Sequence, residues 1–168
     1  MKSIIKTGFA IIALLLVNVI GAQSKPTSSK ETITGKIKDA TITVDYGSPS
    51  VNGRKIWGEL VPFDKIWRAG ANDATTFETD KDLTIEGSKL PAGKYSFFII
   101  PNDKECTIIF NKVAKQWGAY KYKQDEDQLR VVVKQQVVRT ISEKLTYEIN
   151  SNTFSLKWDN WSIPVQIK

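Results

Sequence analysis

The sequence predicts an all-β fold, an antiparallel β-sandwich or a jelly-roll-like arrangement, with a long and partly helical connection around residues 48–76. Apolar and polar residues alternate over many short segments, as half-buried strands require. Clusters of Gly, Pro, Asn and Asp separate these segments and mark turns. Two layers of antiparallel strands packed face to face account for both observations.

The first 22 residues have the features of a secretory signal peptide. Lys2 and Lys6 form a basic region, and an apolar run follows from Phe9 to Ile20. This run is shorter than the roughly 20 apolar residues that a membrane-spanning helix needs. We therefore expect cleavage near Ala22 and a soluble exported protein, periplasmic or secreted, with no integral membrane segment. The only cysteine, Cys106, lies far from the cleavage site, so lipid attachment there is not expected.

Residues 23–30 are polar and predict a flexible leader, whereas residues 31–168 predict a single β-rich domain. Of 24 basic side chains, two belong to the signal, which leaves 22 against 18 acidic ones and a net charge of +4. Charges of both signs alternate along the chain, so we expect no nucleic-acid partner. One cysteine cannot form an intramolecular disulfide, and we expect Cys106 to be a small buried apolar residue.

Several segments carry the period-two pattern of strands. They are Ile42/Val44/Tyr46, Leu83/Ile85, Leu145/Tyr147/Ile149, Phe154/Leu156/Trp158 and Ile163/Val165/Ile167. Residues 94–100 and 106–110 predict a hairpin around the turn at 101–103. A second tight turn is expected at 158–161, which would make residues 145–167 a three-stranded meander. The valine run at 131–133 predicts a strand that is buried on both faces or carries a bulge.

Residues 48–76 interrupt the β pattern. Glycines and Pro62 punctuate this stretch, which also contains Trp57, Phe63 and Trp67. Short turns of helix are expected at 56–60 and 64–68. A long connection with its own aromatic residues is expected to pack against the domain, and such loops often carry function.

A set of motifs resembles an uncharacterised family of exported bacterial proteins, the domain of unknown function 2911. The motifs are GRKIWGELVP at 53–62, KIWRAGANDATT at 65–76, LPAGKY at 90–95, FNK at 110–112 and QWGAY at 116–120. One departure is Asp73, where the family pattern leads us to expect Glu. The resemblance implies export and a β-rich fold, and it implies no catalytic residue.

The chain contains no histidine, which excludes Ser-His-Asp and Cys-His mechanisms and zinc sites that use imidazole. It has no Gly-rich phosphate loop followed by Lys and Ser or Thr. We therefore expect no nucleotide chemistry, no metal and no cofactor.

The leading functional hypothesis is a non-catalytic domain that binds a small polar or glycan-like ligand. Planar donors and flat aromatic faces in the unusual segment would line the site, namely Arg54, Trp57, Trp67, Arg68 and Asn72. The alternative for these residues is structural. The tryptophans would then be core residues, and Arg68 and Asn72 would satisfy loop carbonyls.

Two other functions stay open. A glycosidase-like hydrolase would use Glu59 with Asp64 or Asp73 as paired carboxylates. A structural or protein-interaction module of the cell envelope would use an exposed sheet edge. The alternation of Tyr and Lys over residues 120–123 predicts a solvated edge strand rather than a stacking platform.

Overall fold

The structure is a computed structural model that describes residues 28–168, so the predicted signal peptide and residues 23–27 of the predicted leader lie outside the described residues. The all-β prediction is confirmed. The strands are β1 (Ser28–Ile37), β2 (Ala40–Pro49), β3 (Thr75–Thr79), β4 (Leu83–Ile85), β5 (Ser88–Leu90), β6 (Gly93–Pro101), β7 (Cys106–Asn111), β8 (Asp127–Val133), β9 (Gln136–Ile149) and β10 (Thr153–Gln166), and a short 3-10 turn, η1 (Gln124–Glu126), precedes β8. β1 begins three residues before the expected start of the domain. Within residues 28–168, no helix is long and apolar enough to cross a membrane.

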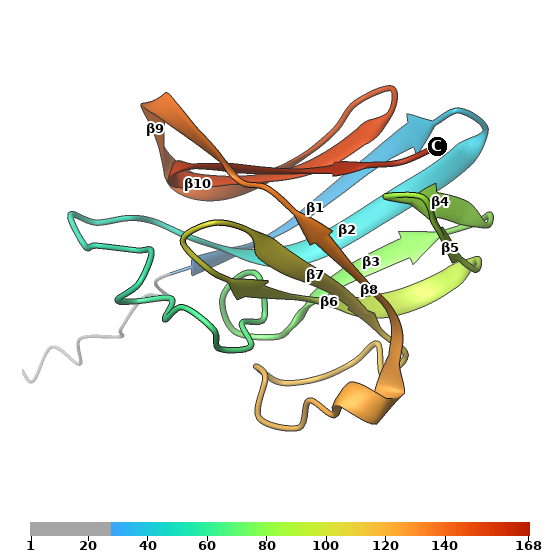
Figure 1. Cartoon of the computed structure of the whole chain (residues 1–168), viewed down its shortest axis with the longest axis horizontal. Coiled ribbons are helices and arrows are strands. Elements are labelled where there is room, and N and C mark those ends of the chain that lie inside the picture. The colour runs from blue at the N-terminus through green and yellow to red at the C-terminus, as the bar shows by residue number, and fades with distance from the viewer. Residues whose placement is uncertain (1–27) are drawn as a thin grey trace, which may run out of the picture.

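Six strands form one antiparallel sheet in the order β1-β2-β3-β6-β7-β8. The predicted hairpin is present in this sheet as β6 and β7, which pair from Ser96 with Asn111 to Pro101 with Cys106. β9 and β10 form a separate antiparallel ribbon that lies over one face of the six-stranded sheet (Figure 1). β4 and β5 form a third, two-stranded sheet near the C-terminus.

The main core lies between the six-stranded sheet and the β9–β10 ribbon. Because side chains alternate between the two faces of a strand, Tyr95 and Phe97 of β6 point to this core while Phe98 points to the other face. Phe154 of β10 joins the two layers, since its ring centroid lies 5.1 Å from that of Phe77 and 5.3 Å from that of Phe97.

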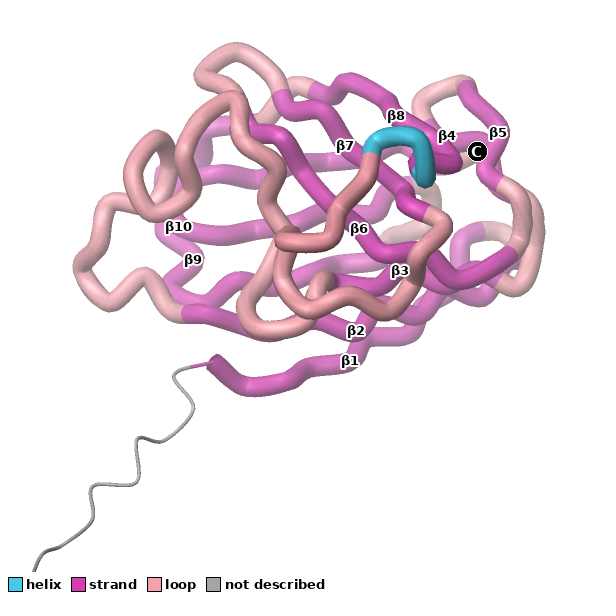
Figure 2. Tube along the Cα trace, turned by 90° about the horizontal axis from the view of Figure 1, so that it is seen from below, coloured by secondary structure: helices cyan, strands magenta, loops and turns pink. Residues whose placement is uncertain are grey.

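A smaller apolar cluster covers part of the outer face of the six-stranded sheet. Phe98 and Ile109 are fully buried there, and Ala119 and Tyr122 pack against them from the connection between β7 and β8. Figure 2 shows this connection crossing in front of the sheet. The outer face is therefore partly closed by a loop rather than by a second layer of strands.

The tight turn predicted at residues 158–161 is wrong. β10 runs without interruption through this region, and the turn of the ribbon lies at residues 150–152 instead. The inward-facing residues change phase here, from Phe154 and Trp158 to Trp161. Asp159, with φ of 52°, lies at this change of phase. The register shifts on each side of it, because Lys157 pairs with Thr146, Asp159 with Ser142 and Trp161 with Val137, so the extra residues lie in β9.

The helical turns predicted at 56–60 and 64–68 are also wrong. Residues 51–74 contain turns, bends and isolated bridges, with no helical segment. Gly58 and Asp64 adopt positive φ values of 84° and 59°, which reverse the handedness of the backbone inside each predicted helix.

The valine run at 131–133 is a strand with one buried face, since Val131 and Val133 are buried and Val132 is exposed. A bulge in the pairing of β8 with β7 lies just before this run.

Cys106 is fully buried, as predicted. Burial raises the pKa of its thiol to about 11. At pH 8 we therefore expect the native protein to react with a thiol reagent such as DTNB at least about 100 times more slowly than the protein unfolded in guanidinium, because only the thiolate reacts.

Rapid labelling of the native protein would contradict this expectation.

The raised pKa of the Cys106 thiol also affects the stability of the protein. Since the thiol of the unfolded chain loses its proton first, the free energy of unfolding falls as pH rises from the ordinary thiol pKa toward 11.

Candidate functional site

The connection between β2 and β3 packs along one end of the domain and is fixed by backbone hydrogen bonds. Trp67 pairs with Ile99 of β6 through N–H to carbonyl bonds of 2.8 and 2.9 Å. Ala69, with φ of 53°, is held by two hydroxyl donors to its carbonyl, from Tyr147 at 2.6 Å and Thr75 at 3.0 Å. The connection therefore has a defined shape even though it contains no regular element.

A cavity of about 400 Å³ lies where this connection meets the ends of β1 and β2 and the middle of β10. We call it the tryptophan–arginine cavity. Its lining residues are Ser28, Pro49, Asn52, Arg54, Leu60, Val61, Trp67, Arg68, Gly70, Ala71, Asn72 and Trp158. Four of the five residues proposed from the sequence as ligand-binding therefore surround one cavity, and Trp57 is not among the lining residues.

The aromatic side of the cavity is part of a larger tryptophan cluster. Trp67 is half-buried and stacks on Trp158, with ring centroids 5.9 Å apart and an angle of 17° between the planes. Trp57 lies behind them, buried, with its ring edge-on to Trp67 at 5.7 Å and stacked on Trp161 at 4.3 Å. Trp57 is therefore a core residue, as the structural alternative expected, whereas Trp67 is half-buried and lines the cavity.

The polar side of the cavity carries two guanidinium groups. Arg54 donates from Nε to the Val51 carbonyl at 3.0 Å and from Nη2 to the Ser50 carbonyl, so its position is fixed by the backbone. Arg68 is half-buried, and its Nε has no hydrogen-bond acceptor. Asn72 is exposed and has φ of 66°, a backbone region that Asn tolerates better than most residues.

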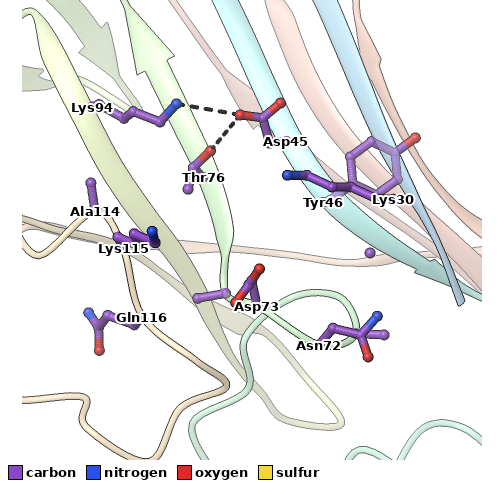
Figure 3. Close-up of a pocket in the computed structure, with 13 residues that line it drawn as sticks. Lys30, Asp45, Tyr46, Asn72, Asp73, Thr76, Lys94, Ala114, Lys115 and Gln116 are labelled. Carbon is purple, nitrogen blue, oxygen red and sulfur yellow. Dashed lines mark hydrogen bonds and ion pairs between the residues drawn. The ribbon is translucent and has the colours of Figure 1, made fainter. Parts of the chain in front are cut away.

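A second cavity, of about 450 Å³, lies on the outer face of the six-stranded sheet, and we call it the sheet-face cavity (Figure 3). Asp45, Thr76 and Lys94 reach it from β2, β3 and β6, whereas Asn72 and Asp73 reach it from the β2–β3 connection. Ala71 and Asn72 line both cavities, so the two lie on either side of this short loop.

Asp45 of the sheet-face cavity is held by three neighbouring side chains. Its carboxylate accepts hydrogen bonds from Thr32 at 2.7 Å, from Lys94 at 3.4 Å and from Thr76 at 3.4 Å. The Thr32 bond and the Lys94 charge lower the pKa of Asp45 despite its partial burial. This carboxylate is therefore ionised and largely committed to its neighbours.

Gln116 fixes the loop that forms the other wall of the sheet-face cavity. The two N–H groups of its Nε2 are shared among three acceptors, namely Ser96 Oγ at 3.1 Å, Asn111 Oδ1 at 3.1 Å and the Val113 carbonyl at 2.9 Å. Asn111 in turn donates to the Lys123 carbonyl at 3.0 Å. The FNK and QWGAY motifs thus contribute buried polar residues that anchor this loop to the sheet.

The edge strand predicted at residues 120–123 is wrong. These residues form turns that lead to η1, because Tyr122 packs on Phe98 at 5.2 Å instead of alternating along a sheet edge. The Tyr122 hydroxyl donates to Asp127 at 2.7 Å and accepts from Arg130 at 2.9 Å. Burial and the Asp127 carboxylate raise the pKa of Tyr122 to about 12. Tyr120, by contrast, is 85% exposed.

Two of the carboxylates considered for hydrolysis, Glu59 and Asp64, line neither cavity. Glu59 forms an exposed ion pair with Lys55 at 3.0 Å, and Asp64 accepts a hydrogen bond from Asn102 at 2.8 Å. Of the three carboxylates only Asp73 lines either cavity. Among residues 28–168, no group of three His, Cys, Asp or Glu side chains is placed to hold a metal ion.

Comparison with known proteins gives one match. The sequence profile of the family described as "Protein of unknown function (DUF2911)" matches residues 28–167, which is nearly all of the described chain. No curated protein and no solved structure matches the chain.

Proposed function

This chain belongs to the DUF2911 family, and from the geometry of the tryptophan–arginine cavity we propose that it is a non-catalytic binding domain for a small polar or glycan-like ligand. The observation that carries the proposal is the convergence on one cavity of a flat aromatic face from Trp67 with polar groups from Arg54, Arg68 and Asn72. Ligand sites combine apolar walls with a few placed polar groups in this way.

The structural alternative for Arg68 and Asn72 fits the contacts less well. If their role were to satisfy loop carbonyls, both side chains would be buried against backbone acceptors. Asn72 is exposed, and Arg68 Nε has no acceptor at all. The cavity therefore has more polar groups than the connection needs to satisfy its own backbone carbonyls, and the surplus supports the binding of a ligand.

The proposal includes the location and the architecture expected from the sequence. We propose that the domain is exported and that its ligand is a component of the cell envelope or its surroundings. We also take the six-stranded sheet and the β9–β10 ribbon as the two layers of a β-sandwich. The cavity then lies between the two layers, because Ser28 and Pro49 come from one layer and Trp158 from the other. It lies at one end of the first layer, since Ser28 begins β1 and Pro49 ends β2.

The test is a titration of the ¹⁵N-labelled protein followed by the indole N–H signals of its five tryptophans. With glucose, N-acetylglucosamine and glucuronate as probes, we expect at least one saccharide to shift the Trp67 and Trp158 signals saturably. Trp117, which is 63% exposed and lines neither cavity, should not respond. The Trp67→Ala variant should bind the same probe roughly tenfold more weakly, because it loses the stacking face.

The matched control is Trp117→Ala, which removes an indole outside both cavities and should leave the affinity unchanged. Equal weakening by the two substitutions, or shifts confined to Trp117, would place binding elsewhere on the surface. A flat response of Trp67 and Trp158 to every probe would argue against a saccharide-like ligand in this cavity.

A further inference from the structure

The charges around the tryptophan–arginine cavity are of one sign. Its lining includes the guanidinium groups of Arg54 and Arg68 and no carboxylate. Among residues 28–168, no Asp or Glu forms an ion pair with either arginine. The sheet-face cavity is different, since Asp45 and Asp73 face its lysines. The tryptophan–arginine cavity therefore has two positive charges and no lining carboxylate, whereas two aspartates offset most of the charge of three lysines at the sheet-face cavity.

Hydrogen-bond donors at this cavity also lack acceptors. Arg68 Nε is buried without a partner, and so is the indole Nε1 of Trp158, a lining residue that is 2% exposed. Buried polar groups in proteins are nearly always hydrogen-bonded, because an unpaired donor keeps the cost of its lost hydration. The indole Nε1 of Trp57, behind the cavity, is buried and unpaired as well. Together with the two guanidinium charges, the unpaired donors of Arg68 and Trp158 support an acceptor that comes from outside the chain.

The geometry of Arg54 adds a third feature. Two of its five N–H donors are fixed by the carbonyls of Ser50 and Val51, which orients the guanidinium plane while the others stay free. A guanidinium group held in this way matches the two oxygens of a carboxylate or phosphate group.

From these observations we infer that the ligand of the tryptophan–arginine cavity carries an oxyanion, a carboxylate or a phosphate. Arg54, Arg68 and Trp158 bind this group, while Trp67 packs against the body of the ligand. This inference rests on the proposed function and specifies the chemical class of the ligand. An acidic sugar combines both parts, an anionic group for the arginines and a ring face for the indole.

The experiment compares glucuronate, glucose 6-phosphate and glucose at constant ionic strength, with the Trp158 Nε1–H and Arg68 Nε–H signals as readout. We expect the anionic sugars to shift both signals saturably, and at least one of them to bind at least about tenfold more tightly than glucose. The carboxylate and phosphate probes identify which oxyanion the site prefers. Arg68→Ala should reduce the affinity for the anionic sugars to that for glucose, and Arg68→Lys, which keeps the charge but lacks the planar fork, should lie between.

Arg139→Ala is the matched control, because Arg139 is an exposed arginine of β9 that lines neither cavity. It removes the same charge and should leave the affinities unchanged. If glucose binds as tightly as both anionic sugars and Arg68→Ala does not change their ratio, the oxyanion inference is overturned while the proposed function stands. If none of the three sugars shifts either signal, the inference is overturned, and the proposed function fails with it unless N-acetylglucosamine binds.

Discussion

The Phe154→Ala variant is expected to lose about 3–5 kcal/mol of its free energy of unfolding, the range typical of deleting a buried phenylalanine ring. Phe154 is 1% exposed, and its ring lies 5.1 Å from Phe77, 5.3 Å from Phe97 and 5.1 Å from Tyr147. Two of these neighbours belong to the six-stranded sheet and one to β9. The substitution therefore opens a cavity where the two layers meet, and the surrounding strands cannot collapse to fill it.

The measurement is equilibrium unfolding in urea, with the slope of the transition checked to be unchanged. Tyr120→Ala is the control, because it deletes an aromatic ring of similar size that is 85% exposed. Its free energy of unfolding should stay within about 0.5 kcal/mol of the wild-type value. Similar losses for the two variants would show that Phe154 does not join the layers in solution.

The strands could be predicted because one buried face gives a strand its period-two pattern. Ile42, Val44 and Tyr46 of β2 all lie in the main core, as their spacing indicated. The pairing of the strands was harder to predict from the sequence. In β10 the pattern changed phase near Asp159, and a sequence pattern does not distinguish a turn from an irregular pairing with the neighbouring strand at such a point, since either can change the phase.

The helical turns expected in residues 48–76 failed for a different reason. Glycines, tryptophans and charged residues at short spacing are compatible with a turn of helix, but backbone hydrogen bonds to distant strands determine the path. Trp67 pairs with Ile99 of β6, and Ala69 is held by Tyr147 of β9. Contacts over such sequence separations have no signature within the segment itself.

The candidate site could be predicted in part. Arg54, Trp67, Arg68 and Asn72 come from one connection, so a cluster of unusual residue types was enough to associate them. Trp158 lines the same cavity from β10, where its pattern indicated only a buried strand residue. The unpaired donors and the absence of a lining carboxylate depend on tertiary structure, and the proposed oxyanion ligand was inferred from these features.

The Gly47→Ala variant is expected to lose both stability and ligand binding, because at Gly47 the backbone of β2 touches the loop that separates the two cavities. A Cβ at this position would lie 2.1 Å from the carbonyl oxygen of Ala71 and 2.8 Å from its carbonyl carbon. The same two residues share a hydrogen bond of 3.2 Å from the Ala71 N–H to the Gly47 carbonyl. No side-chain rotation can relieve a clash between a Cβ atom and a backbone carbonyl, so the loop must move.

We expect this displacement to cost about 1–3 kcal/mol in the free energy of unfolding, as overpacking does. It should also weaken saccharide binding by roughly tenfold or more, because Ala71 and Asn72 line the tryptophan–arginine cavity. Urea unfolding and the indole titration measure the two effects separately.

Gly53→Ala is the matched control, since a Cβ there meets no atom within 4 Å. This substitution adds only the strain of a φ of 66°, about 1–2 kcal/mol. A Gly47→Ala protein with wild-type stability and affinity would show that β2 does not hold this loop, and that the cavity depends on other contacts for its shape.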